Sequence, residues 1–202
     1  MAENYEKLDA LGTETYSMLN MAKELVKPGV RMLDVAKRIE DLAASKKLKF
    51  AFPINISVNE QAAHYTPTFD DKTVFGEDVV KLDVGLRDGD NLTDCAITVD
   101  LSSKYSKLVE ATERALDAAL GTVKAGRKLN EIGREVAKVA DGYGFNPIRN
   151  LGGHGMENGE MHAHYFIPNY DNGDETELRE GDLIAVEVFL TNGYGEVAEG
   201  DY

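Results

Sequence analysis

The chain has 202 residues, of which 43% are hydrophobic and 29% are charged, as in an ordinary globular protein of one or two domains. Its 36 acidic and 22 basic residues give a net charge of -14, which argues against nucleic-acid or anionic-membrane partners. No apolar run approaches the roughly 18 residues of a membrane span, and the N-terminus lacks the basic stretch of a signal peptide. The single cysteine, Cys95, excludes an internal disulfide, so the cytoplasm is the expected location.

Four helices are predicted from apolar residues at helical spacing, the fourth beginning at Leu129-Asn130 with Ile132, Val136 and Val139 on its apolar face. The first covers residues 5–26 and ends before Pro28-Gly29. The second is expected to have Asp34 as its N-cap and to end at Lys46-Lys47, where basic residues suit a helix C-terminus. The third covers residues 104–123. Each should pack one apolar face on a core.

Between the second and third helices the sequence predicts strands. Residues 50–58 are expected to form a strand around Pro53, and residues 59–67 a polar loop. Two apolar runs then flank Asp88-Gly89, a dipeptide typical of a two-residue hairpin turn. This turn would place Asp83 directly opposite Asp94.

Two directly opposed carboxylates would have Cβ atoms about 5 Å apart, where like charges destabilise a sheet. Val80, Leu82 and Val84 suggest that the first strand is covered on both faces. A buried carboxylate pair needs a shared proton or a cation, and a divalent metal suits this spacing. Two aspartates that point to water are the alternative interpretation.

The sequence also repeats itself. Val26-Lys27-Pro28-Gly29 recurs as Val123-Lys124-Ala125-Gly126, and residues 78–84 align with residues 182–188 at a constant offset. Each half, about 1–103 and 104–202, therefore reads helix, turn, helix, strand, loop, strand. Asp83 and Glu187 are equivalent in this repeat, and packing of two similar halves would bring them together at a site. Residues 192–202 are Gly-rich and predict a loop.

The four histidines form a second group of candidates. His154 stands between glycines, which allow a backbone or a ligand to approach closely. Imidazole combined with carboxylates suits Mn, Fe, Co or Zn better than Mg or Ca. His64 and His162 occupy similar places in the repeat and could act as proton donors or oxyanion stabilisers beside a metal. For His164 we expect a hydrogen-bonded structural role.

These residues lie in motifs that resemble type 2 methionine aminopeptidases, the archaeal and eukaryotic class. The motifs follow one another in the family's order over nearly the whole chain. They are Phe52-Pro53, Asn59, Ala62-Ala63-His64-Tyr65-Thr66-Pro67, Lys81-Leu82-Asp83-Val84-Gly85, Asp94-Cys95-Ala96, Asn150-Leu151-Gly152-Gly153-His154, Met161-His162-Ala163, Ile167-Pro168-Asn169, Glu180-Gly181-Asp182 and Glu187. The resemblance implies an α+β pita-bread fold with two pseudo-symmetric halves, each an antiparallel sheet covered by helices, in a single catalytic domain over residues 1–202.

The resemblance also implies a metal centre. Asp83, Asp94, His154 and Glu187 match four of the family's five ligands of two divalent metal ions, with Asp94 bridging both. In such a site the ions polarise the scissile carbonyl and lower the pKa of a bound water. Glu187 is implied to move the proton. The implied reaction is removal of the initiator methionine from the N-termini of nascent polypeptides.

Substrate contacts are implied as well. His64 and His162 match the two histidines that contact the substrate and help to stabilise the tetrahedral intermediate. Phe52, Met161 and Phe189 fall where the family lines its pocket for the methionine side chain. A departure concerns pocket width, because His164 and Tyr165 replace small or polar residues expected after the substrate histidine.

A second departure lies at the end of the sequence. In the family, a small inserted domain follows the position of Glu187, and a returning C-terminal strand carries a fifth, bridging glutamate. This sequence stops near the start of that insertion, so the second half is expected to be incomplete and to have an exposed edge. Either a second chain supplies the strand, or the chain is a truncated product, or Glu196 or Glu199 substitutes, which is the weakest explanation in so Gly-rich a segment.

Two other functions remain open. A proline-specific peptidase of the same fold is one, although the loop over residues 59–67 favours the methionine branch. A catalytically inactive pita-bread binding module, such as a ribosome- or RNA-associated relative, is the other. The four matching ligands and the acidic composition disfavour it, since an acidic surface offers no phosphate-binding patch. Measured metal stoichiometry would separate these classes.

Overall fold

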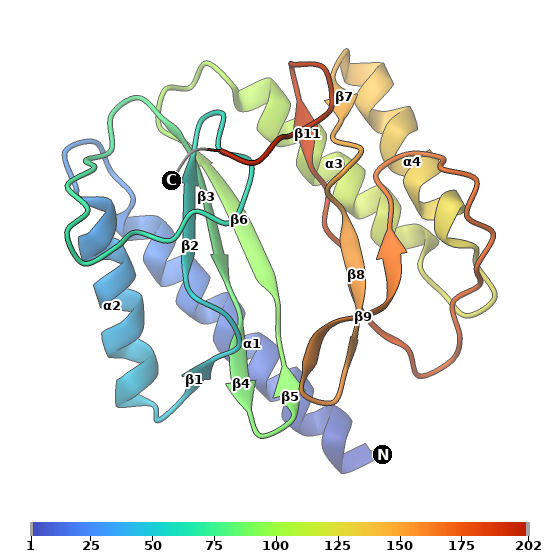
Figure 1. Ribbon diagram of the computed structural model, residues 1–202, viewed down its shortest axis with the longest axis horizontal. Helices are drawn as coiled ribbons and strands as arrows, with labels where there is room; N and C mark the ends of the chain where they lie inside the picture. Colours follow the sequence, from blue (N-terminus) through green and yellow to red (C-terminus); the bar gives the residue numbers. More distant parts are fainter. Residues whose placement is uncertain (1, 201–202) are drawn as a thin grey trace. The chain divides into compact units, whose positions relative to one another are not determined.

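A computed structural model describes residues 2–200, which form two units (Figure 1). The first unit comprises the chain up to Tyr105 together with the hairpin tip Asn158–Glu160, and the second comprises the remaining residues. None of the helices within residues 2–200 combines the length and apolar character that crossing a bilayer requires. That residues 1–202 act as a single catalytic domain stays a prediction.

Helices α1 (Ala2–Leu25) and α2 (Met32–Ser45) open the first unit, which confirms both predicted helices. However, Asp34 is not the N-cap of α2; it lies in the first turn, and Arg31 occupies the cap position without a capping hydrogen bond from its side chain. The backbone caps this helix instead, because the Met32 N–H donates to the Thr73 carbonyl at 2.9 Å. A distant loop therefore decides where α2 begins.

The strands of the first unit form two antiparallel three-stranded sheets, in the orders β2-β3-β6 and β1-β4-β5. Their bounds are β1 (Lys49–Phe50), β2 (Asn55–Val58), β3 (Val79–Val84), β4 (Leu86–Asp88), β5 (Asn91–Leu92) and β6 (Cys95–Asp100). The single strand predicted over residues 50–58 is therefore wrong. It is divided around Phe52-Pro53, since proline cannot donate a ladder hydrogen bond.

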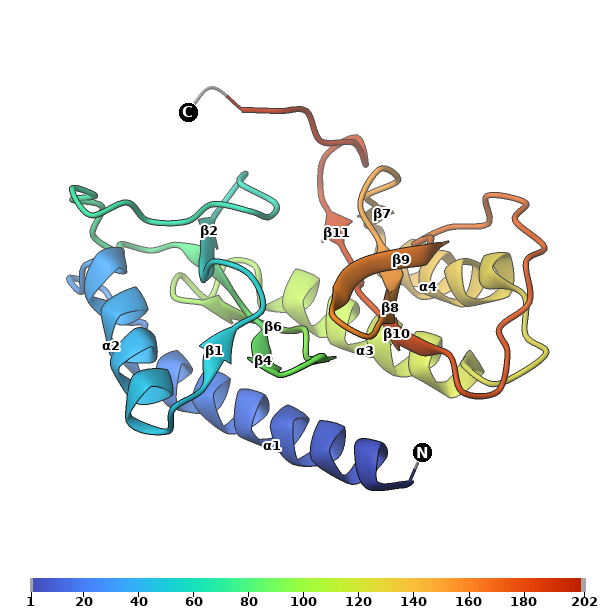
Figure 2. The ribbon, with the colours of Figure 1, turned by 60° about the horizontal axis from the view of Figure 1, so that its bottom comes forward.

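The core of the first unit lies on one face of the sheet β2-β3-β6, where α1 and α2 both pack (Figure 2). Val80, Leu82 and Val84 are fully buried on this face. The alternate residues Lys81 and Asp83 are half-buried and point to the opposite face. The expectation that β3 is apolar on both faces is wrong, because its three buried apolar residues share one face.

The predicted register of the aspartate hairpin is also wrong. Asp83 pairs with Ala96, not with Asp94, and Asp88 pairs with Asn91, so that the turn is Gly89-Asp90. Gly89 has a φ of 63°, as the first central residue of a type II′ turn requires. Because the register is shifted by two residues, each side chain keeps its predicted face. Asp83 and Asp94 are diagonal neighbours rather than directly opposed.

The second unit contains helices α3 (Ser106–Thr122) and α4 (Leu129–Tyr143), which confirm the third predicted helix and the fourth, predicted to begin at Leu129-Asn130. Its strands form antiparallel sheets in the orders β10-β8-β9 and β11-β7. Their bounds are β7 (Asn146–Pro147), β8 (Gly153–Glu157), β9 (Glu160–Ile167), β10 (Leu183–Ala185) and β11 (Leu190–Thr191). Residues 192–200 contain no strand, as predicted, and residues 201–202 lie outside the described part.

The internal repeat reappears in the hydrogen bonds of the backbone. The Gly29 N–H donates to the Phe75 carbonyl at 2.8 Å, and the Gly126 N–H donates to the Leu178 carbonyl at 2.8 Å. Both glycines have positive φ, 86° and 81°. In the first unit β2 pairs with β3, the strand that carries Asp83. In the second unit β8 pairs with β10, the strand that precedes Glu187. The repeat is incomplete in one respect, since β9 stands where the first unit has a loop.

Candidate metal centre

In the second unit, the two predicted metal ligands lie next to each other. His154 is on β8 and Glu187 follows β10, and His154 Nε2 is 3.0 Å from Glu187 Oε1. His154 is buried, at 7% exposure, whereas the Glu187 side chain keeps 28%. Strands β8 and β10 can come this close because Gly153 has no Cβ; a Cβ there would collide with the Ala185 carbonyl. The expectation that glycines beside His154 permit close backbone approach is confirmed.

The other ring nitrogen of His154 bears on what this pair can bind. Nδ1 lies 3.2 Å from the Gly155 carbonyl oxygen, so the tautomer protonated at Nδ1 donates there. That tautomer turns the Nε2 lone pair toward the Glu187 carboxylate. Two electron-rich atoms at 3.0 Å require a proton or a cation between them. A buried imidazole and a carboxylate arranged in this way fit a divalent transition metal.

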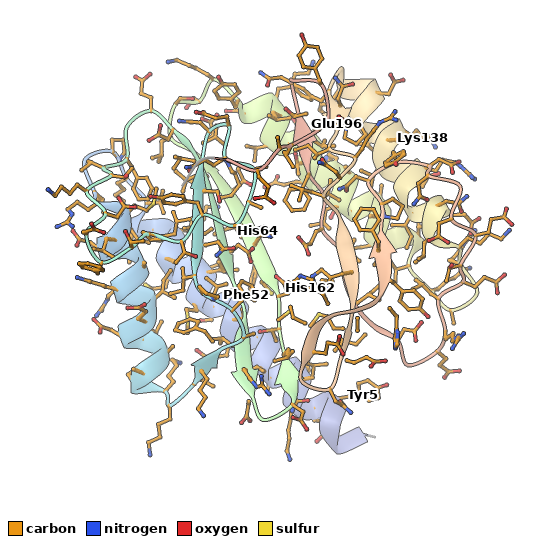
Figure 3. The ribbon with its side chains drawn as sticks, viewed as in Figure 1. Tyr5, Phe52, His64, Lys138, His162 and Glu196 are labelled. Atoms are coloured by element: carbon orange, nitrogen blue, oxygen red, sulfur yellow. The ribbon has the colours of Figure 1, made fainter. Side chains whose placement is uncertain are left out.

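His162 belongs to the same cluster. It lies on β9, and its ring centroid is 4.3 Å from that of His154, with an interplanar angle of 63°. Its side chain is exposed, and it is labelled in Figure 3. The predicted pocket residues Met161 and Phe189 are both half-buried in this unit. The structure thus brings His154, Glu187 and His162 together.

His164 lies outside this cluster. Its Nε2 contacts Glu157 Oε1, and both side chains are largely exposed, at 66% and 51%. Its φ of 47° interrupts the regular geometry of β9. A hydrogen-bonded residue on the hairpin surface is consistent with the structural role expected for it.

The first unit carries the two predicted aspartate ligands, both half-buried. Asp83 is the last of the half-buried residues on the face of β3 opposite the core, and Asp94 directly precedes β6. Burial, together with the charges of Asp94 and Asp83, raises the pKa of the Cys95 thiol to about 11. The negative charges of both carboxylates therefore raise the pKa of the same thiol, and Cys95 stays protonated at neutral pH.

Phe52 packs against Gly85, the residue that follows β3. A Cβ on Gly85 would overlap the Phe52 ring and would stand 2.5 Å from the Thr93 carbonyl oxygen. The Gly85 carbonyl also accepts a bond from the Ala51 N–H at 2.9 Å. The aromatic ring, which is labelled in Figure 3, can pack here only on a glycine.

His64 is held on a loop of the first unit and is exposed (Figure 3). Its φ of 67° is unusual for a residue with a side chain. The loop is fastened at both ends: the Asn59 N–H donates to the Val79 carbonyl at 2.9 Å, and the Ile56 N–H donates to the Tyr65 carbonyl at 2.7 Å. A strained residue on an anchored loop is typical of a functional position.

Two neighbours of the aspartates escaped the sequence-based prediction. Asn55 lies opposite Asp83 in the β2–β3 ladder, is 7% exposed, and donates to the Thr66 hydroxyl at 3.0 Å. Lys81 donates from Nζ to the Asn59 carbonyl at 2.8 Å. Burial lowers the pKa of Lys81 to about 8, although the charge of Glu60 opposes this shift. The only signal in the sequence was a polar residue inside an apolar strand.

Comparison with known proteins places this chain. Residues 6–200 match metallopeptidase family M24. The chain belongs to this family. It is 40% identical over 200 residues to a methionine aminopeptidase of Methanocaldococcus jannaschii, a match that covers 98% of this chain and 68% of that protein. A methionine aminopeptidase of Thermococcus onnurineus is 44% identical over 177 residues, covering 87% of this chain and 60% of that protein.

The M24 fold is equally clear in three dimensions. The crystal structure of a methionine aminopeptidase from Thermotoga maritima matches with a TM-score of 0.88 at 27% identity, covering 96% of this chain and 82% of that one. This confirms the predicted α+β pita-bread fold. The M24 chain spans about 60–68% of the length of the two archaeal relatives. As a metallopeptidase family, M24 implies the use of a divalent metal, consistent with the donors described above.

Proposed function

We propose that this chain is a methionine aminopeptidase of type 2, the archaeal and eukaryotic class, which removes the initiator methionine from nascent polypeptides. The observation that carries the proposal is the 40% identity to the Methanocaldococcus jannaschii methionine aminopeptidase over 98% of this chain. Relatives with that name recur at 36–44% identity. The buried pair of His154 and Glu187 supports it, because a hydrolase of this type needs a metal held by imidazole and carboxylate groups.

The metal ligands in this proposal are Asp83, Asp94, His154 and Glu187, which would hold two divalent ions. The mixture of three carboxylates and one imidazole suits Mn, Fe, Co or Zn. Bound there, the ions supply Lewis-acid polarisation of a carbonyl and a water acidic enough to ionise near neutral pH. The contact of His154 Nδ1 with the Gly155 carbonyl fixes the ring for binding through Nε2.

The chain's own residues complete the proposed mechanism. His64 and His162 donate hydrogen bonds to the carbonyl oxygen of the substrate as negative charge develops on it. Glu187 accepts a proton from the attacking water at a carboxylate oxygen and passes it to the leaving amine. The edge-to-face contact of His162 with His154 limits rotation of the His162 ring. Phe52, Met161 and Phe189 contact the methionine side chain.

The substrate partner is the N-terminus of a polypeptide that begins with methionine. Location in the cytoplasm and a second chain that carries a returning glutamate strand stay predictions. The proline-specific and the non-catalytic alternatives are not favoured by any particular feature of the described residues.

Methionine release from a peptide that begins Met-Ala tests the proposal. The purified chain with added Mn or Co should release methionine, and Asp94→Asn should lower the rate by at least about 100-fold, since even the loss of an outer-shell partner costs 10–100-fold. Asp88→Asn is the matched control, because Asp88 is an exposed residue of the same hairpin. No release with any metal would contradict the proposed activity.

Metal stoichiometry separates the enzyme from a binding module. Equilibrium dialysis followed by metal analysis should find two ions per chain, and fewer in Asp94→Asn. A chain that binds no divalent ion tightly would belong to the non-catalytic class.

A further inference from the structure

A buried polar pair joins α1 to the hairpin that leads into Asp94. Thr15 is fully buried and stands among the apolar residues of α1 that form the core. Its hydroxyl donates to the Leu11 carbonyl at 2.8 Å, one helical turn earlier. Its oxygen also lies 2.7 Å from the hydroxyl oxygen of Thr93, which is itself only 7% exposed. A buried hydroxyl is costly unless it is hydrogen-bonded, so this contact constrains both residues.

The directions of these bonds follow from counting protons. Each threonine hydroxyl has one proton and lies 2.7 Å from the other; Thr15 also has the Leu11 carbonyl at 2.8 Å, and Thr93 also has the Leu86 carbonyl at 3.3 Å. Because the contact with Leu11 is much shorter than the contact with the Leu86 carbonyl, Thr15 donates to Leu11 and Thr93 donates to Thr15. The Thr93 oxygen then accepts from the Leu86 N–H at 3.0 Å. A single chain of bonds thus runs from the Leu86 amide through Thr93 and Thr15 into the backbone of α1.

This chain of bonds lies where the strand pairing changes. The β3–β6 ladder ends at the pair Val84 and Cys95, and the β4–β5 ladder contains the pair Arg87 and Leu92. Between the two ladders, the Thr93 N–H donates to the Leu86 carbonyl at 3.0 Å. In a regular antiparallel pair the Leu86 N–H would donate back to the Thr93 carbonyl. It donates to the Thr93 hydroxyl instead.

The replacement of the Thr93 carbonyl by the Thr93 hydroxyl as acceptor affects the next residue, Asp94. Because the Thr93 side chain takes the place of its own carbonyl, the peptide that links Thr93 to Asp94 is released from the ladder geometry. The Thr93 carbonyl oxygen is directed toward Gly85, where a Cβ would stand only 2.5 Å away. The orientation of the peptide group that leads into Asp94 therefore depends on the Thr93 hydroxyl, and that hydroxyl is held by Thr15.

We propose that Thr93 and Thr15 are positioning residues for the Asp94 carboxylate. The inference rests on the proposed function, in which Asp94 is a metal ligand. Neither threonine touches the metal or the substrate. Thr93 sets the direction in which the chain enters Asp94, and Thr15 fixes Thr93 from the helix on the other side of the sheet.

Metal affinity of folded variants is the test. Thr93→Val keeps the shape of the side chain and removes the hydroxyl. Calorimetric titration with Mn or Co should give a dissociation constant about 10–100-fold higher than for the wild type, the range typical of lost outer-shell partners. Thr15→Val should weaken binding in the same direction. Thr93→Ser retains the hydroxyl and should bind metal nearly as tightly as the wild type.

Thr112→Val is the matched control, because Thr112 makes the same helical bond, to the Leu108 carbonyl at 2.8 Å, in the second unit. It should leave metal affinity unchanged. Hydrogen exchange of the Leu86 amide without metal should be faster in Thr93→Val than in Thr93→Ser. If Thr93→Val does not fold, Thr15→Val and Thr93→Ser decide the question by the same titration.

The outcomes are distinguishable. Unchanged affinity in a folded Thr93→Val, or in Thr15→Val where Thr93→Val does not fold, would overturn this inference while the proposed function stands. Equal weakening by Thr93→Ser and Thr93→Val would also overturn it, because the hydroxyl would then not be responsible. A wild-type chain that binds no metal would overturn the proposed function and this inference with it.

Discussion

Asp71 illustrates how a single carboxylate fastens the loop that carries His64. It is 8% exposed and accepts hydrogen bonds from the Tyr65 hydroxyl at 2.6 Å and from the Thr73 N–H at 2.7 Å. Burial by itself raises the pKa of Asp71, but the hydrogen bonds from Tyr65 and Thr73 outweigh it and hold the pKa below its ordinary value. Such a carboxylate stabilises the fold in its ionised form.

The stability of the protein should therefore depend on pH through Asp71. Since the folded pKa is lower than the unfolded one, this stabilisation is present above the ordinary Asp value of about 3.9 and is lost as the pH falls through the folded pKa. Asp71→Asn should lower the free energy of unfolding by about 1–3 kcal/mol at pH 6. Urea unfolding at pH 6 and at about pH 3 measures this, and the difference between variant and wild type should shrink at the lower pH.

Asp70→Asn provides the control at the neighbouring position, because Asp70 is exposed and accepts a hydrogen bond from the nearby Thr68 hydroxyl. It should change stability by less than about 0.5 kcal/mol. An equally large effect for both variants would show that charge on the loop, rather than the buried bonds, is what matters.

At the scale of elements, the junction between β3 and β4 depends on a residue without a side chain. Gly85 faces the Phe52 ring and the Thr93 carbonyl too closely to accept a Cβ. By contrast, Gly12 lies within α1 and has no heavy atom within 4 Å of the place where a Cβ would stand. The packing therefore requires a glycine at position 85, whereas it leaves room for a larger residue at position 12.

Alanine substitutions should separate them. Gly85→Ala should destabilise the protein by about 1–3 kcal/mol, as overpacking does. Gly12→Ala should stabilise it by about 0.5–1 kcal/mol, because glycine is costly inside a helix. Denaturant midpoints measure both changes. A neutral Gly85→Ala would contradict the close packing of Phe52 on the strand junction.

At the scale of the whole molecule, metal binding should be coupled to folding stability. A ligand that binds only the folded state at 100 times its dissociation constant stabilises that state by about 2.7 kcal/mol. For a chain of this size that corresponds to a rise of about 5–10 °C in the unfolding midpoint. Calorimetric scans with Mn or Co, and again with a chelator, measure the shift.

His154→Ala should abolish the metal-dependent shift, whereas His164→Ala should retain it. Both variants lose an imidazole, but only His154 is buried beside Glu187. Loss of the shift in both variants, or retention in both, would contradict the assignment of His154 as a ligand.

Local periodicity and motif order determined much of this protein. Apolar residues at helical spacing gave α1, α2 and α3 within a few residues, because an amphipathic helix needs only its own face and a core. The repeated turns and acidic strand positions predicted the duplication. The motif residues predicted the family and the residue types of the candidate site, since metal ligation requires particular donors whatever the packing.

Only the tertiary structure decided the rest, because it depends on contacts between distant segments. The Thr73 carbonyl, not Asp34, determines where α2 begins. The turn at Gly89-Asp90 pairs Asp83 with Ala96, which the Asp88-Gly89 dipeptide could not reveal. The contact of His154 with Glu187 and the bond between Thr15 and Thr93 join residues far apart in sequence. Residue types are local properties, whereas register and burial are settled only when the whole core packs.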